Sequence, residues 1–94
     1  NMKGEKTQKE ILKELQIIPG IGKSIAKNLF DIGVHSIEDL VGKNPEKLFA
    51  LSNQEAGVIQ DRCLLYTFRC AAYYAEGGRD KKKLLWWNWK DTQG

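Results

Sequence analysis

The sequence predicts an all-α protein of about five helices, folded as a single domain over residues 1–94. Apolar residues recur at the three- and four-residue spacing of amphipathic helices, and capping signals precede most of the apolar runs. No segment sustains the alternating pattern of a strand, apart from a short stretch at residues 85–89. A chain of 94 residues with 41% apolar side chains is sufficient for one hydrophobic core but not for two.

The first half of the chain is predicted to form a unit of short helices over residues 7–51, after a polar start at 1–6 that we expect to be frayed. Thr7 and Glu10 match a capping box, in which two side chains satisfy backbone amides at a helix start. The later helices are bounded by glycines and by Ser or Asn-Pro start signals. The expected helices run over residues 7–17, 23–32, 37–41 and 45–51.

Residues 52–76 are predicted to form the longest helix, which begins at residue 53 after Ser52 as its cap and has Glu55 in its first turn. Two glycines directly after residue 76 stop it. The segment is apolar on two sides, as expected of a central helix that the others surround. One of its apolar rows contains Ile59, Cys63, Tyr66, Cys70 and Tyr73.

The remaining segment, residues 77–94, combines a basic run at Lys81, Lys82 and Lys83 with three tryptophans between residues 86 and 89. Basic residues beside aromatic rings could bind single-stranded nucleic acid by charge and base stacking. Alternatively, the rings fold over the helical core and leave the lysines in solvent. Three exposed tryptophans would be an unfavourable surface for a soluble monomer, so we favour packing, with a partner interface as the remaining alternative.

The turn between the first two helices carries the strongest local signal, with the sequence Pro-Gly-Ile-Gly at residues 19–22. Gly20 and Gly22 permit a positive φ and leave no Cβ to keep another backbone away. The backbone amides of Gly22, Lys23 and Ser24 open the second helix, where they have no intrahelical acceptor and the helix dipole is positive. Such an array binds anions, and phosphate is the usual one.

The side chains around this turn support the same interpretation. Lys23 and Lys27 add positive charge on one side of the second helix, and the Ser24 hydroxyl can donate to an anion. We expect Ile21 to point into the core and Ala26 to let the two helices cross closely. A connection used only for packing is the alternative, which the lysines and the net charge of +3 make less favoured.

This run resembles the helix-hairpin-helix motif of DNA repair and recombination proteins, in which an apolar-Pro-Gly-apolar-Gly turn is followed four positions later by a small residue. The resemblance implies a SAM-like hairpin unit. The implied contacts to DNA phosphates are Gly20, Gly22, Lys23, Ser24 and Lys27. It also implies that the main-chain carbonyls of Ile18 and Ile21 hold a monovalent cation that bridges to phosphate. Hairpins used only for packing or protein contact occur in the same families, so that alternative stays open.

The resemblance extends beyond the hairpin. Residues 33–48 are similar to the short helices that follow the hairpin in such domains. Residues 61–75 and 86–91 resemble the bacterial pathogenicity-locus proteins of the Cdd type, some of which are labelled mitomycin resistance proteins. Together these likenesses cover residues 10–91. They imply a family but little biochemistry, because the function assigned to that family is itself mostly inferred from its hairpin.

Basic residues of the second half are candidates for further contacts with DNA. Arg62 and Arg69 are two helical turns apart on one face of the long helix, next to aromatic rings. The candidate accessory phosphate contacts are Arg62, Arg69, Lys81, Lys82 and Lys83. For the two arginines we favour the alternative, in which they fasten the long helix by pairing with Asp31, Asp39 or Glu46.

The two cysteines, Cys63 and Cys70, are too far apart along a helix, at about 10 Å of rise, to form a disulfide. Together with His35 they lack the close spacing of a zinc site, and nothing places a base beside either thiol. We therefore expect both to be small buried hydrophobes, which suits a reducing, cytoplasmic location.

The sequence thus predicts a module that binds DNA without sequence preference, through backbone phosphates, with double-stranded DNA as the expected partner. We expect no enzymatic activity and no cofactor, because no catalytic arrangement emerges and Ile17 stands where a nucleotide-binding P-loop needs glycine. A helical adaptor that binds a protein partner or itself, with a purely structural hairpin, is the main alternative. A thiol-based redox protein is a third. No signal peptide or membrane span is expected.

Overall fold

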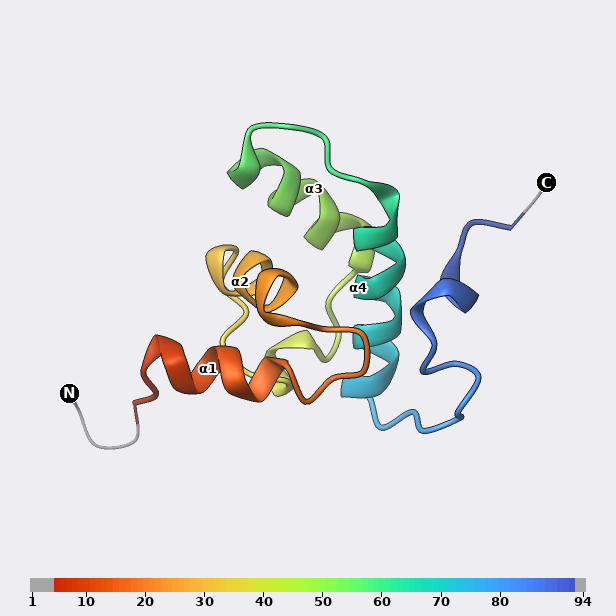
Figure 1. Cartoon of the computed structure of the whole chain (residues 1–94), viewed down its shortest axis with the longest axis horizontal. Coiled ribbons are helices and arrows are strands. Elements are labelled where there is room, and N and C mark those ends of the chain that lie inside the picture. Colours follow the sequence, from red (N-terminus) through yellow and green to blue (C-terminus); the bar gives the residue numbers. More distant parts are fainter. Residues whose placement is uncertain (1–4, 93–94) are drawn as a thin grey trace.

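The computed structural model describes residues 5–92, which form four α-helices and two 3₁₀ turns without any strand (Figure 1). In chain order the elements are α1 (Gln8–Leu15), α2 (Lys23–Asp31), η1 (Glu38–Leu40), α3 (Pro45–Ala56), α4 (Arg62–Ala75) and η2 (Trp86–Trp89). The all-α prediction is confirmed. The expected count of five helices is wrong by one, because the segment at 37–41 forms only the turn η1. Most of the start that we expect to be frayed lies outside the described residues.

The predicted helix starts have the expected caps. The Glu10 amide donates to Thr7 Oγ1 at 3.2 Å, and the Thr7 amide donates to Glu10 Oε1 at 2.9 Å, which completes the capping box of α1. At the start of α3, Asn44 Oδ1 accepts from the Glu46 amide at 2.8 Å, with Pro45 in the first helical position. These interactions span only a few residues, so they follow from the local sequence.

The predicted helix over 53–76 is wrong in its first third. Ser52 does not start a helix but continues α3, which ends at Gly57 with φ of +76°, a left-handed conformation that favours glycine. The chain then turns, and α4 starts after Asp61, whose side chain accepts from the Cys63 amide at 2.7 Å. The intervening loop is held by Gln60, whose backbone amide donates to Asn53 Oδ1 at 3.0 Å.

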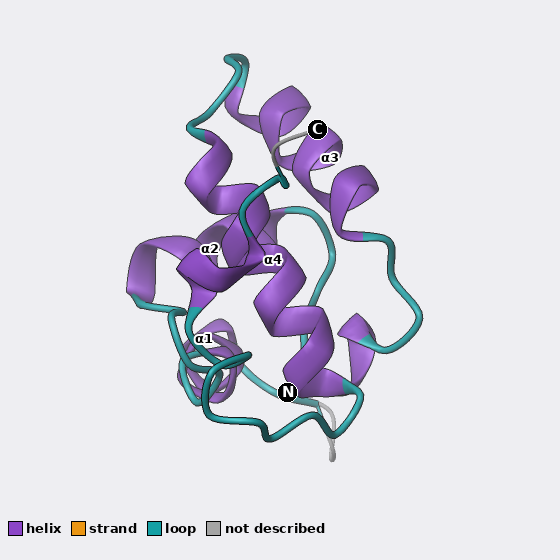
Figure 2. Cartoon of the chain, turned by 90° about the vertical axis from the view of Figure 1, so that its right-hand side faces the viewer, coloured by secondary structure: helices purple, strands orange, loops and turns teal. Residues whose placement is uncertain are grey.

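The helix α4 lies between the α1–α3 unit and the C-terminal tail, as Figures 1 and 2 show from two directions. It packs against α3 and η1 on one side and against η2 on the other. Phe68 is fully buried at the centre of the core, where Leu15 of α1 and Leu29 of α2 are also fully buried. None of the helices within residues 5–92 is long and apolar enough to cross a lipid bilayer.

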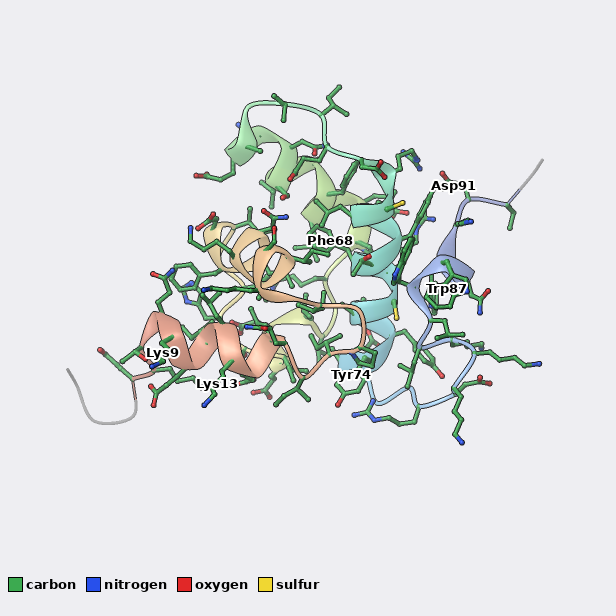
Figure 3. All side chains as sticks on the ribbon, viewed as in Figure 1. Lys9, Lys13, Phe68, Tyr74, Trp87 and Asp91 are labelled. Carbon is green, nitrogen blue, oxygen red and sulfur yellow. The ribbon has the colours of Figure 1, made fainter. Side chains whose placement is uncertain are left out.

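The tail folds back along α4, in agreement with the favoured packing alternative. Trp89 Nε1 donates to the Lys83 carbonyl at 2.6 Å, and the Trp89 ring lies 5.5 Å from that of Tyr73. Trp86 and Trp89 are half-buried, whereas Trp87 is 48% exposed on the outer side of the tail (Figure 3). The tail is therefore part of the folded structure.

Candidate nucleic-acid interface

The turn between α1 and α2 is anchored from inside. Ile18 and Ile21 are buried, and the Ile21 amide donates to the Ile18 carbonyl at 3.1 Å. Gly20, between them, has φ of +87°, as the turn predicts. Ala26 is fully buried in α2, which packs against α1. The predictions for Ile21 and Ala26 are therefore confirmed, and the turn presents its remaining backbone to solvent.

The start of α2 carries unpaired backbone amides. In the described part of the chain, the amides of Gly22, Lys23 and Ser24 have no acceptor, and no side chain caps the helix. All three residues are exposed. Because the helix dipole is positive at this end, an anion here would receive several hydrogen bonds together with a favourable field.

Gly22 has a different conformation from the one we expect. Its φ is −93°, which any residue can adopt, and a Cβ built on it would meet no atom within 4 Å. Neither the turn geometry nor internal packing therefore requires glycine at this position. A group from outside the molecule that approaches the backbone closely would require it.

The lysine contributions to this surface are unequal. Lys23 is exposed and forms no ion pair within the described residues. Lys27 instead pairs with Asp31 of the same helix, with Nζ 2.7 Å from Oδ1. A phosphate would have to compete with Asp31 for Lys27, so Lys23 is the stronger candidate contact.

One of the two carbonyls proposed to hold a monovalent cation already takes part in a hydrogen bond. The Ile18 carbonyl already accepts from the Ile21 amide, which leaves it one lone pair for a cation. The cation site stays a prediction. No group of three or more His, Cys, Asp or Glu side chains between residues 5 and 92 is arranged to hold a metal ion.

The two arginines of α4 hold the tail. Arg69 contacts Glu46 Oε2 and Asp91 Oδ1, both at 2.9 Å, and donates to the Trp89 carbonyl at 2.7 Å. Arg62 pairs with the same aspartate through Oδ2 at 2.6 Å. The pairing of Arg69 with Glu46 confirms one favoured prediction, whereas the partner of Arg62 is a tail residue that we did not expect.

These contacts change the ionisation of the acidic partners. Hydrogen bonds from Arg69 hold the pKa of Glu46 below its usual value. Hydrogen bonds from Arg69 and then Arg62 do the same for the pKa of Asp91. Both arginines are thereby engaged within the protein, so a phosphate would have to compete with Glu46 and Asp91 for them.

The basic run in the tail remains accessible. The side chains of Lys81, Lys82 and Lys83 are exposed, and the Lys83 ammonium lies 5.7 Å from the centre of the Tyr73 ring. These lysines add positive charge beside α4 without being fixed by an ion pair in the described structure. They stay candidates for accessory contacts.

The cysteines differ from the prediction in one respect. Cys70 is buried as expected, but Cys63 is exposed, because α4 starts only one residue before it and its first turn extends beyond the core. No disulfide joins them. A hydrogen bond with Asp61 raises the pKa of Cys63, and burial raises that of Cys70, which opposes thiolate formation in both. His35 stacks on Phe30 instead, with ring centres 4.9 Å apart.

A cavity of about 350 Å³ opens beside the turn, between α2, the start of α4 and the tail. Its lining includes Gly20, Ile25, Asn28, Asp61, Thr67 and Trp86. Sequence reasoning missed it, since these residues come from three segments that only the fold brings together. The sole sequence signal was the tryptophan cluster, which did not indicate where the rings would lie.

Comparison with known proteins shows the family. The family model described as Cdd1, pathogenicity locus, matches residues 8–94. This chain belongs to the Cdd1 pathogenicity locus family. The match covers nearly the whole sequence and includes the turn, α4 and the tail, so the family resemblance expected from the sequence is confirmed.

The Cdd1 family chain is also similar to part of a much larger protein. It is 33% identical over 51 residues to the ATP-dependent DNA helicase Hel308 of Thermoplasma acidophilum. The matched region covers 54% of this chain but only 8% of the helicase. No solved structure matches the chain.

Proposed function

We propose that this Cdd1 family protein binds DNA through backbone phosphates at the start of α2, without sequence preference and without chemistry of its own. The expected target is duplex DNA, with Lys23 as the main charged contact and the amides of Gly22, Lys23 and Ser24 as donors. The helix-hairpin-helix interpretation of α1, the turn and α2 belongs to this proposal.

The observation that carries the proposal is the unexplained glycine at position 22. A Cβ there would meet nothing within 4 Å, and the backbone is in an ordinary extended conformation. Ser or Asn would cap α2 better than glycine does. A glycine that leaves the amides uncapped is consistent with a site whose ligand supplies the missing acceptor.

Three further features support the proposal. The net charge is +3, and Lys23 beside the uncapped amides is not neutralised by an ion pair in the described chain. The exposed run at 81–83 adds charge that can act at longer range. Part of the chain is similar to a protein named as a DNA helicase.

The test is fluorescence anisotropy with a labelled random-sequence duplex, titrated at low and at physiological salt. We expect the affinity to fall steeply with salt, because binding to phosphates releases counterions. Scrambling the duplex sequence at fixed salt should change the affinity little. Lys23→Glu should weaken binding at least about tenfold at low salt, because it replaces an attractive charge by a repulsive one at the contact.

The matched control is Lys9→Glu, which makes the same change in net charge. Lys9 is exposed on α1, and its side chain lies at the end of α1 far from the turn (Figure 3). If both variants lose affinity equally, binding depends on net charge rather than on the start of α2. If the wild-type protein does not bind even at low salt, the proposal is wrong.

A protein-interaction adaptor is a second candidate, favoured by one observation. The loop between α3 and α4 exposes two neighbouring apolar side chains, Val58 at 62% and Ile59 at 88%. We had expected Ile59 in the apolar row of a helix, but the loop turns it to solvent. The adaptor predicts self-association or partner binding that Ile59→Asp abolishes, with no effect on DNA affinity.

A further inference from the structure

The cavity beside the turn lies close to the proposed phosphate site, on which this inference rests. Gly20 belongs to the turn and also lines the cavity. Gly22, the first of the uncapped residues, is only two residues further along, which is at most about 7 Å of chain. A ligand whose anionic group sits on the α2 amides therefore has the cavity within reach of its adjoining parts.

The walls of the cavity have the chemistry of a site for a flat, partly polar ring. The Trp86 indole forms one wall, and Ile25 with Leu64 adds apolar surface. The Trp86 and Trp87 rings form a T-shaped pair, with 86° between their planes and centres 5.7 Å apart, so they are not stacked face to face. An indole at the edge of an open cavity is a platform on which another ring can stack.

Two polar residues line the cavity, and one of them, Asn28, also borders a second cavity beside Asp31 and Glu55. The Asn28 side chain forms no hydrogen bond with any other described residue, so its amide can donate and accept toward a ligand. Asp61 caps α4 through Oδ1, and its carboxylate, which also hydrogen-bonds the Cys63 thiol, is exposed and lines the cavity. A carboxylate repels an anion and accepts from amino or imino groups, which places phosphate outside the cavity and a hydrogen-bonding ring inside it.

We propose that this cavity takes an unpaired nucleobase, stacked on Trp86 and contacted along its edge by Asn28 and Asp61, while the adjoining phosphate binds at the start of α2. Bases in a duplex are stacked and paired, so only a strand with an unpaired base can fill the site. The protein then prefers single-stranded DNA, or a duplex that contains an unpaired nucleotide, over a perfect duplex.

The test compares two labelled ten-nucleotide single strands at one low salt concentration. One has mixed bases and the other has the same phosphates with abasic sugars throughout. We expect the strand with bases to bind at least about fivefold more tightly, the low end of the effect of stacking one base. Tryptophan fluorescence should be quenched by the strand with bases and not by the abasic strand.

Two variants alter the base site and keep every residue of the proposed phosphate site. Asn28→Ala removes a side chain that forms no hydrogen bond in the described structure, and Trp86→Leu keeps apolar packing but removes the ring. In Trp86→Leu the ratio between the two strands should approach one, and in Asn28→Ala it should fall below the wild-type value, while the affinity for the abasic strand is unchanged in both. Gln54→Ala, an exposed amide on α3, is the control and should keep the wild-type ratio.

The possible failures can be distinguished. Equal affinity of the wild-type protein for the two strands, or a ratio unchanged in Asn28→Ala, overturns the base site and leaves phosphate binding intact. Equal affinity for the two strands is also expected if the cavity binds an apolar side chain of a partner protein instead of a base, and it overturns the base site in that case too. Failure to bind duplex even at low salt overturns the proposed function, and failure to bind either single strand overturns this inference.

Discussion

Gly20 lies directly against Trp86, so that a Cβ on Gly20 would stand 3.4 Å from Cδ1 of the indole. This contact joins the α1–α2 turn to the tail, which come from opposite ends of the chain. The left-handed backbone of Gly20, with φ of +87°, adds a second constraint on the same residue. The turn and the tail therefore support each other's position, and Gly22, two residues later, is under neither constraint.

The two glycines are predicted to respond oppositely to substitution. Gly20→Ala should lower the free energy of unfolding by about 1–2 kcal/mol, since a Cβ is strained at positive φ and meets Trp86. Gly22→Ser should leave stability unchanged or raise it by a few tenths of a kcal/mol, because serine caps a helix slightly better than glycine. Urea unfolding followed by circular dichroism measures both.

Gly22→Ser is predicted to weaken DNA binding although it does not destabilise the fold. The serine at position 22 should lower the affinity for a random duplex several-fold, since its side chain occupies the α2 amides and the space above them. The same anisotropy titration that tests Lys23 measures this. Unchanged affinity in a stably folded Gly22→Ser protein would mean that the α2 amides do not contact phosphate.

Asp31 is predicted to restrain DNA binding through Lys27. The carboxylate holds the Lys27 ammonium at 2.7 Å, so Asp31→Asn should free the lysine, remove a negative charge and raise the affinity about two- to fivefold at low salt. Stability should change by no more than about 0.5 kcal/mol, because such pairs along a helix contribute little. Unchanged affinity in Asp31→Asn would show that Lys27 does not contact the DNA.

Arg69 and Arg62 share a partner but differ in burial, which predicts unequal effects on the tail. The Arg69 side chain is 19% exposed and contacts Glu46, Asp91 and the Trp89 carbonyl. Arg69→Ala should therefore cost about 1–2 kcal/mol, because it removes a mostly buried side chain and leaves the Trp89 carbonyl without its charged donor.

The Arg62 side chain is 54% exposed, so Arg62→Ala should lower the stability much less than Arg69→Ala does. Chemical denaturation gives the two values, and the tryptophan emission maximum reports on the tail. It should shift to longer wavelength in Arg69→Ala and stay near the wild-type value in Arg62→Ala. Equal costs for the two substitutions would show that burial does not set the strength of this contact.

Acid is predicted to loosen the same contact. The folded state lowers the pKa of Glu46 and Asp91 through hydrogen bonds from Arg69, joined at Asp91 by Arg62. A lowered pKa means stabilisation that is complete above the unfolded values of about 4 and is lost as the pH falls through the folded values. Tryptophan emission should therefore be constant above about pH 5 and shift below about pH 4. In Glu46→Gln the acid-induced loss of stability should be smaller.

Much of the fold could be predicted from the sequence where the deciding interactions are local. The capping box of Thr7 and Glu10 and the Asn44 cap each depend on residues within a few positions of one another. The division of the segment at 52–76 was also encoded locally, by Gly57 and by Asp61. Ser52 and Glu55 gave a competing start signal, and the apolar row from Ile59 to Tyr73 favoured one long helix.

The candidate site was predictable only in those parts that depend on local sequence. The amides at the start of α2 follow from the Pro-Gly-Ile-Gly turn, since any helix start leaves amides without intrahelical acceptors. The exposure of Cys63 was not predictable, because it depends on how far α4 extends beyond the core. Lys27 and Asp31 are four residues apart on one helix, so their ion pair was predictable from the sequence.

The sequence by itself determined the helical fold class, the turn between α1 and α2 and the family, because periodicity, caps and glycine turns act over short stretches of chain. Only the tertiary structure decided that Asp91 of the tail pairs with both arginines of α4, and that Trp86 meets Gly20 beside a cavity lined by Asn28 and Asp61. Such contacts depend on how segments distant in sequence pack, which no local pattern encodes.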